Sequence, residues 1–242
     1  MDTKAFRAMS YGMYLIASGD EQGQAGCVVN TFEQITSSPS QTVVAVNKDN
    51  FTSSVIRRTG RYTIGVLGES APMELIGRFG FHTSVDFDKF SATEHTVDAQ
   101  GLPTVTDHAV STFQVRVTET IDAGSHWLFI GSVEDAQVIS HEAPMTYAYY
   151  HQVKGGKTPP KASSYIPEDA QAAPKPADAA AAPASDAPDD PLATNQAPGT
   201  PGTSTWRCTV CGYELTIQGD TLPADYVCPI CGSPAALFER IA

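Results

Sequence analysis

Two Cys-x-x-Cys-Gly motifs near the end of the chain constrain its fold more than any other feature. They occupy residues 208–212 and 228–232, with 16 residues between the second cysteine and the third. Each motif can point two sulfurs at one centre, and its glycine permits a positive φ after the second ligand. Two such turns make a tetrahedral four-sulfur site, which suits a zinc ion or a single iron. We therefore predict that one metal is bound by Cys208, Cys211, Cys228 and Cys231.

The composition divides the chain into three zones. Residues 1–157 mix apolar runs, turns and charges as a folded domain does. Residues 158–204 hold 10 of the 17 prolines and few large apolar side chains. Because that stretch cannot bury enough surface to offset chain entropy, we predict a disordered linker. Residues 205–242 are too few to fold on a hydrophobic core alone, so the metal would stabilise them.

The charge and the first residues restrict the class of protein. The net charge is −12, from 15 basic and 27 acidic residues, which argues against binding to nucleic acid. We find no apolar run long enough for a bilayer and no signal pattern at Met1–Arg7, so we expect a cytoplasmic protein without a membrane partner. In a reducing compartment the fifth cysteine, Cys27, is expected to be a buried apolar residue on a strand.

The first zone is expected to be mainly β. Runs rich in Val, Ile, Thr and aromatic residues predict strands, with turn residues between most of them. Two short helices fit the gaps, since one opens with an Asn cap and the other has a proline near its first turn. Few helices and no regular alternation favour an antiparallel barrel. The predicted strands are Met13–Ser18, Gln41–Asn47, Tyr62–Leu67, Thr112–Thr118 and Trp127–Val133, and the predicted helices are Asn50–Arg58 and Pro72–Phe79.

The flanks of the cysteine motifs resemble rubredoxins. Trp206 stands two residues before the first ligand, Tyr213 two after the second, and Phe238 follows as a core aromatic. The resemblance implies a single iron that shuttles one electron. The loop between the motifs is shorter than in most free-standing rubredoxins, so a structural zinc ribbon remains an alternative.

Polar residues end two apolar runs in the first zone, at 30–39 and 45–52. A buried phosphate and ribityl chain would use such groups, with Lys48 supplying charge and Asn50 and Thr52 acting as donors at a helix start. The alternative is that they are ordinary capping and turn residues. We find no Gly-x-Gly-x-x-Gly or phosphate-loop motif, which argues against the Rossmann and P-loop classes.

An ordered set of short segments resembles the flavin reductase family, which binds FMN in a split β-barrel. The segments are 35–39, 45–52, 79–81, 88–90, 126–131 and 146–151. The resemblance implies a homodimer with the flavin near the subunit interface. It also implies flavin contacts from Asn30, Thr31, Phe32, Thr36, Ser37, Asn47, Lys48, Asn50 and Thr52.

Aromatic residues and one histidine are further candidates. The resemblance implies that His126 lies on the nicotinamide side, although a turn histidine is an equal alternative. Phe79 and Phe81 would lie near the flavin or the partner subunit, with core packing as the alternative. On a strand, the residues Tyr147, Tyr149 and Tyr150 would alternate, so only one or two of them could face the pocket.

Together the two resemblances imply an electron relay. NAD(P)H would reduce FMN, which would reduce the iron, and the iron would reduce an acceptor protein, expected to be a flavodiiron protein in nitric oxide or oxygen detoxification. A linker of 47 residues would reach roughly 35–40 Å. Two alternatives remain: a ligand-binding barrel with a zinc ribbon as docking module, and a reductase that releases reduced FMN to a monooxygenase.

Overall fold

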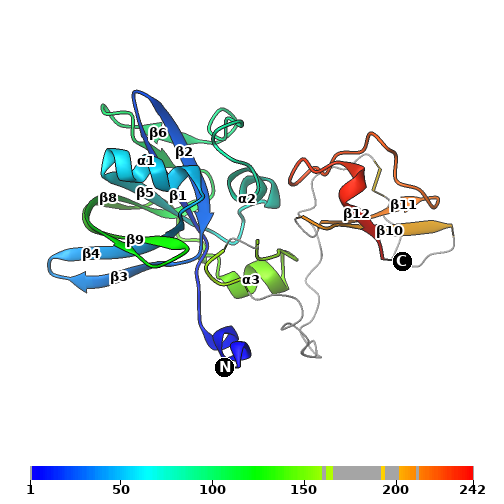
Figure 1. Cartoon of the computed structure of the whole chain (residues 1–242), viewed down its shortest axis with the longest axis horizontal. Helices are drawn as coiled ribbons and strands as arrows, with labels where there is room; N and C mark the ends of the chain where they lie inside the picture. Colours follow the sequence, from blue (N-terminus) through cyan, green and yellow to red (C-terminus); the bar gives the residue numbers. More distant parts are fainter. Residues whose placement is uncertain (1, 160–161, 166–191, 194–201, 211–212, 242) are drawn as a thin grey trace.

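The computed structural model describes residues 2–159, 162–165, 192–193, 202–210 and 213–241 (Figure 1). A β-rich first domain holds the strands β1 to β9, and a small tail holds β10 to β12. Within the described ranges no helix combines the length and the apolar character needed to cross a bilayer.

A seven-stranded antiparallel sheet forms the body of the first domain, in the order β2-β1-β5-β8-β9-β4-β3. In its register Ile16 on β1 faces Cys27 on one neighbour and Ile64 on the other. Cys27 is buried on β2, as predicted. The strands are β1 Tyr14–Asp20, β2 Gly23–Val29, β3 Phe32–Ser37, β4 Ser40–Asn47, β5 Arg61–Leu67, β8 Ala109–Asp122 and β9 His126–Val138.

The sheet curls until its two ends share one core. The ring of Phe32 on edge strand β3 lies 5.5 Å from that of Tyr14 on β1, near the opposite edge. Cys27 and Val29 of β2 belong to the same buried cluster as Val44 of β4. Among the described strands no ladder joins β2 to β3. The sheet is therefore a barrel split along one side, which confirms the predicted mainly-β class.

Helix α1, Phe51–Thr59, is specified locally by its two ends. The Asn50 side chain accepts a hydrogen bond from the Thr52 N–H at 3.0 Å, which caps the helix. At the other end Gly60 adopts φ 68° and its N–H donates to the Ile56 carbonyl. This is the left-handed cap that glycine adopts without a side-chain penalty. The predicted helix is confirmed.

Helix α2, Met73–Gly80, covers one face of the sheet (Figure 1). Its inner side buries Leu75, Ile76 and Phe79 in a second core cluster, which also contains Tyr150. Phe79 is therefore a core residue, the alternative given for it above. The buried packing of this side fixes where the helix and the loop after it stand.

Lys89 is a buried cation that ties β2 to the end of α2. Its Nζ donates to the Gly26 carbonyl at 2.8 Å and to the Phe79 carbonyl at 3.0 Å. The side chain is 2% exposed, and burial lowers the pKa of its ammonium group to about 8. The positive end of Lys89 also suits the negative end of the α2 dipole.

Helix α3, Tyr147–Gln152, packs beside α2 against the same cluster. Thr146 caps it by accepting from the Tyr149 N–H at 3.1 Å. The premise that this tyrosine run lies on a strand is wrong, because the Thr146 cap begins a helix there. The remaining small elements of the first domain are a 3-10 helix at Thr3–Ala8 and the hairpin of β6 His95–Val97 with β7 Pro103–Val105.

The tail is a three-stranded antiparallel sheet, ordered β11-β10-β12. Its small core contains three of the cysteines together with Leu215, Ile217, Tyr226 and Phe238. The rings of Tyr226 and Phe238 pack edge-on at 5.3 Å. Its elements are β10 Thr203–Cys208, β11 Glu214–Gln218, the 3-10 helix Ala235–Leu237 and β12 Phe238–Arg240.

Candidate functional site

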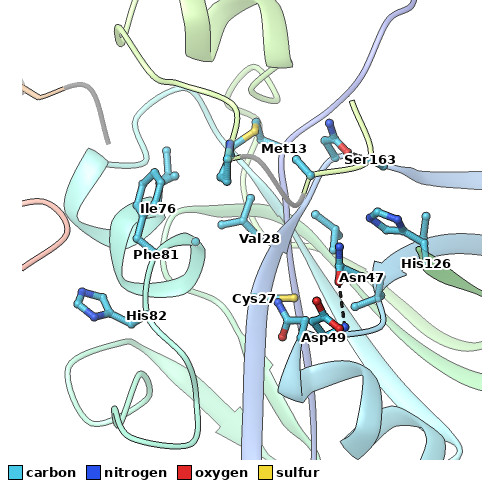
Figure 2. A pocket seen from close by; sticks show the side chains of 18 of the residues that line it. Met13, Cys27, Val28, Asn47, Asp49, Ile76, Phe81, His82, His126 and Ser163 are labelled. Carbon is cyan, nitrogen blue, oxygen red and sulfur yellow. Dashed lines mark hydrogen bonds between the residues drawn. The ribbon is translucent and has the colours of Figure 1, made fainter. Parts of the chain in front are cut away.

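A cavity of about 370 Å³ opens between the sheet and the helices (Figure 2). Its walls come from β2, the end of β4, the start of α1, the end of α2 and the loop after it, the start of β9, and α3. Its volume is within the range of about 300–1,000 Å³ that is typical of small-molecule sites. Figure 2 shows Phe81 and His82 on one side of Val28, with Asn47 and His126 on the other.

The polar wall of this pocket is built from two strand ends and the start of α1. Asn47 at the end of β4 pairs in register with His126 at the start of β9. The Asn47 side chain accepts from the Asp49 N–H at 2.9 Å, and Asn50 caps α1. Two predicted flavin residues, Asn47 and Asn50, thus meet the predicted His126 in one cavity.

His126 is half-buried at the pocket edge, and this burial lowers the pKa of its imidazole. Its Nδ1 lies 2.9 Å from the Ser125 hydroxyl. The ring is therefore neutral at physiological pH and offers a hydrogen-bonding edge without a positive charge.

Beneath the polar wall lies a buried hydroxyl. Thr52 Oγ1 is fully buried and has no hydrogen-bond partner at bonding geometry among the described residues. Burial raises the pKa of the neighbouring Cys27 thiol, against smaller lowering effects from Lys89, Thr52 and Asn50. Cys27 thus stays protonated and inert, and Thr52 keeps hydrogen-bonding capacity near the start of α1.

An aromatic wall faces the polar one. Tyr147 and Tyr150 both line the pocket, and their rings stack with centroids 5.7 Å apart. One helical turn separates them, so they share a face of α3. The Tyr147 hydroxyl donates to Thr158 at 2.8 Å, and the Tyr150 hydroxyl donates to the Lys157 carbonyl at 3.1 Å.

Residues 157–159 and 162–165, called the strap below, supply a further part of the pocket lining. The Asn30 side-chain Nδ2 donates to the Ser164 hydroxyl at 2.6 Å, and the Ser163 hydroxyl donates to the Asn30 side-chain Oδ1 at 2.8 Å. Thr31 Oγ1 lies 3.1 Å from the Ser163 hydroxyl. Lys157, Pro159, Ala162 and Ser163 line the cavity. Asn30 and Thr31, two more predicted flavin residues, therefore meet the strap, which sequence reasoning did not place at the site.

Six of the nine predicted flavin residues are not among the described residues that line this pocket. Two of them, Thr31 beside the strap and the buried Thr52, are described above, and the other four lie elsewhere. Phe32 is buried in the barrel core against Tyr14 and Phe113. Thr36 and Ser37 lie at the far end of β3, where the Thr36 hydroxyl donates to the Pro39 carbonyl at 2.5 Å. The fourth residue is Lys48.

Lys48 is not among the described residues that line the cavity. Its ammonium group forms an ion pair with Asp122 and lies 4.4 Å from the centre of the Trp127 ring. The Arg57 guanidinium lies 4.6 Å from the same ring. Among the described lining residues the lysine is instead Lys157, whose position beyond the apolar runs gave no sequence signal.

The cysteine cluster forms the second site. The sulfurs of Cys208, Cys228 and Cys231 lie within 4.8 Å of one another, and all three residues are buried. Cys211, the fourth predicted ligand, lies outside the described residues. The Cys208 and Cys231 sulfurs are 3.6 Å apart. Sulfurs about 2.3 Å from a tetrahedral metal stand about 3.7 Å apart, so the cluster fits a thiolate metal site.

The second motif forms the turn that its glycine predicts, and one hydroxyl lies against a sulfur. The Gly232 N–H donates to the Cys228 carbonyl at 2.9 Å, and Gly232 adopts φ 70° as the motif predicted. Ser233 Oγ lies 3.1 Å from the Cys231 sulfur. Hydrogen bonds of this kind stabilise a thiolate and tune a bound metal.

Two family models match the chain. The flavin reductase like domain covers residues 6–156, and the rubrerythrin, rubredoxin-like domain covers residues 206–239. The chain belongs to the flavin reductase-like family. A rubredoxin-like domain is fused to the C-terminal side of this reductase, so both resemblances drawn from the sequence are confirmed.

Relatives of this flavin reductase are similar over the whole chain or over its first domain. The high molecular weight rubredoxin of Moorella thermoacetica is 36% identical over 259 residues, covering 100% of each chain. The ferric-chelate reductase (NAD(P)H) of Archaeoglobus fulgidus is 41% identical over 166 residues, which are 69% of this chain and 98% of that protein.

A solved structure shares the fold. The NADH:FAD oxidoreductase of Streptomyces globisporus C-1027 has a TM-score of 0.54 at 19% identity, covering 59% of this chain and 84% of its own. The protein is therefore an oxidoreductase whose cofactors are a flavin, NAD(P)H as donor and iron in the rubredoxin-like domain.

Proposed function

We propose that this flavin reductase transfers electrons from NAD(P)H to its own rubredoxin-like domain and then to a separate acceptor protein. One observation carries the proposal. Phe81 lines the pocket and also packs against the core that holds the cysteines. The two sites therefore share a wall, and electrons would cross a single segment of chain to pass between them.

The pocket offers the groups that a flavin needs. Its apolar floor, formed by Met13, Val28 and Ile76, would cover the ring system, while the amides of Asn47 and Asn50 would bind polar edges. The unpartnered Thr52 hydroxyl lies near the α1 start, where backbone N–H groups and the helix dipole favour an anion. When bound, the flavin supplies an acceptor for hydride and a donor of single electrons.

The charge for a flavin phosphate has two candidate sources. Lys157 lines the pocket from the strap, whereas Lys48 is engaged by Asp122 and Trp127. Asp49 also lines the pocket and would repel an anion placed beside it. We propose that Lys157 supplies the nearer positive charge. The contacts predicted for Phe32, Thr36, Ser37 and Lys48 remain predictions.

His126 and the tyrosines would orient the donor. His126 is neutral and faces the pocket edge, so it can hydrogen-bond a carboxamide without attracting the phosphates. Tyr147 and Tyr150 present a flat apolar face, and the strap supplies a further part of the lining. These residues bind, orient and exclude water, and hydride transfer requires no acid or base from the protein.

The buried thiolate cage would hold the iron. Burial of Cys208, Cys228 and Cys231 keeps water from the metal, and the hydroxyl of Ser233 lies against one sulfur. When bound, the iron supplies a one-electron carrier whose ligands stay in place.

The acceptor beyond the tail is proposed to be a flavodiiron protein that reduces nitric oxide or oxygen, as the sequence resemblance implied. A homodimer through the flavin domain, a cytoplasmic location and a role in nitric oxide detoxification are likewise proposals. Their support is the full-length similarity to the high molecular weight rubredoxin.

Anaerobic titration with NADH tests this function. The purified chain, loaded with flavin and iron, should lose the yellow flavin colour and the red ferric colour together as NADH is added. A tail that contains zinc, or ferric iron that stays red while the flavin bleaches, would contradict the proposal.

A second candidate activity rests on the 41% identical ferric-chelate reductase. The first domain alone would deliver electrons to a ferric chelate at the pocket. Under that alternative, disruption of the cysteine site would leave ferric-chelate reduction unchanged, whereas an obligatory path through the tail predicts its loss.

A further inference from the structure

The outer side of α2 is covered by the rubredoxin-like tail (Figure 1). Met73 and Phe81 are partly buried against the core that holds the cysteines. Gly77 stands between them, one helical turn after Met73, and is buried. These three residues follow the four-residue spacing of one helix face. This face therefore looks away from the barrel core, toward the tail.

Gly77 permits the closest approach in this contact. A Cβ built at Gly77 would collide with the backbone carbonyl oxygen of Ile230 and would stand 3.0 Å from the Ile230 side chain. A backbone oxygen held in a metal-binding turn cannot move aside as a flexible side chain can. Any residue other than glycine would therefore force the tail and the helix apart.

The same turn of the tail meets the loop after α2. A Cβ at Gly232 would lie 3.2 Å from His82 Cε1, so the second Cys-x-x-Cys-Gly motif lies against His82. Gly80, Phe81 and His82 line the opposite side of this segment, toward the pocket. Residues 80–82 thus separate the pocket from the motif that contains Cys228 and Cys231.

We propose that the Met73, Gly77, Phe81 and His82 face is a docking site for the second cysteine motif of this chain, and that Gly77 is the residue that admits it. The proposal deepens the function given above, because docking there would set the contact across which one electron passes per event. In each event the reduced flavin loses one electron and ferric iron becomes ferrous. The committed occupant is the tail of the same chain.

Two glycine substitutions on α2 form a matched test in the full-length, flavin- and iron-loaded protein. Gly77→Ala adds a methyl group against the Ile230 carbonyl, and Gly77→Val adds more bulk. Gly80→Ala adds the same methyl group on the same helix, where its nearest contact is Val28 Cγ2 at 3.5 Å, an ordinary distance. Because Gly80 and Val28 line the pocket, this variant is a control for docking and not for the flavin step. Alanine favours a helix over glycine, so neither alanine variant is expected to unfold α2.

A second variant changes Met73, at the start of α2, where the helix meets the tail. Met73→Glu places a carboxylate at the first position of α2, where an acidic residue suits the helix dipole. The same carboxylate would face an apolar tail core that carries thiolates. Met73 and Gly77 do not line the pocket among the described residues, so the flavin step itself should persist in both variants.

Small-angle X-ray scattering reads docking without reference to activity. We expect the wild type and Gly80→Ala to share one radius of gyration, and Gly77→Val and Met73→Glu to lose the compact form. Stopped-flow reduction should show flavin bleaching by NADH at the wild-type rate in Gly77→Val and Met73→Glu, which change no described residue of the pocket lining. Iron reduction should slow roughly tenfold or more in the two extended variants, because transfer would then depend on the effective concentration set by the linker.

The outcomes separate the docking site from the function. A compact Gly77→Val protein would overturn the docking site. An extended Gly77→Val protein whose iron is reduced at the wild-type rate would overturn the role of the contact in transfer. If the wild type is compact but NADH does not reduce its iron, the proposed function is refuted. The scattering result would still decide whether the docking site exists. Loss of the compact form only on dilution would instead place the tail of a second copy on this face and overturn the committed occupant.

Discussion

Asn47 at the end of β4 stands directly opposite His126 at the start of β9, and both side chains reach the same pocket. About half of the first domain separates them along the chain, and the strand register brings them together. The pocket of the first domain and the cysteine cluster of the tail can be tested separately.

Asn50 caps α1, and we propose that it also contacts the flavin. Asn50→Ala should cost about 1 kcal/mol in the free energy of unfolding, because the Thr52 N–H loses its acceptor. Asn50→Ser keeps a capping oxygen and should restore most of that stability. Urea denaturation of the flavin-free variants measures the cap, and fluorescence titration with FMN measures binding. FMN affinity that follows stability in both variants would show that Asn50 is a cap and nothing more.

The two lysines near the pocket should differ in their effect on FMN. Lys157→Gln should weaken FMN binding by about 1–3 kcal/mol if a charge-assisted contact to the phosphate is lost. Lys48→Ala breaks a partly exposed ion pair with Asp122 and should cost less than about 1 kcal/mol in stability. Isothermal titration calorimetry with FMN measures the loss of binding free energy in each of the two variants. A larger loss with Lys48→Ala would return the phosphate to the position predicted from the sequence.

Lys89 should make stability depend on alkaline pH. Burial lowers its pKa in the folded protein to about 8, from 10.5. Below pH 8 the charged amine is buried at full cost. Between the two pKa values the unfolded chain binds more protons, so stability rises with pH.

Lys89→Met removes this titration. The stability of the wild type relative to that variant should therefore increase between about pH 8 and 10.5, by on the order of 3 kcal/mol. Burial raises the pKa of Tyr62 to about 12, and this residue is present in both proteins. Its contribution therefore cancels in the difference in unfolding free energy between them. Denaturation midpoints of both proteins, measured across this pH range, show how the difference in their stability changes with pH. A flat difference would show that Lys89 is not desolvated in solution.

Loss of one cysteine ligand should separate the two half-reactions. Cys208 is fully buried in the cluster, and Cys208→Ser replaces a thiolate with a poor iron ligand. Flavin reduction by NADH should continue at the wild-type rate, whereas reduction of an added protein acceptor should be lost. Iron content and steady-state assays check both halves. Acceptor reduction that survives in the variant would mean that the reduced flavin reaches the acceptor without the tail.

Local signals predicted much of the fold. Asn50 and Gly60 specify α1 from adjacent residues, and the β-branched run before Asn47 specifies β4. For strand β2 the sequence predicted only that Cys27 lies on a strand, without bounds, because Gly23 and Gly26 give the segment low strand propensity and its pairing with β1 supplies the stability. The tyrosine run at α3 was taken for a strand because aromatic residues favour strands, while the Thr146 cap begins a helix.

The site could be predicted only where its residues lie near one another in the sequence. Asn47 and Asn50 were found because they follow one strand. Lys157 and Ser163 were missed because they lie across the boundary between a folded zone and a proline-rich one, and only the folded chain returns them to the pocket. Gly77 carried no signal at all, since its role depends on the Ile230 carbonyl of the tail.

The most direct measurement of the relay is the rate of iron reduction after NADH is mixed anaerobically with the loaded chain at several protein concentrations. If the flavin serves the iron of the same molecule, the red ferric absorbance will fade in a first-order phase that follows flavin reduction and does not change with dilution. A rate that falls in proportion to protein concentration, or iron that keeps its ferric absorbance while the flavin is fully reduced, would contradict the account.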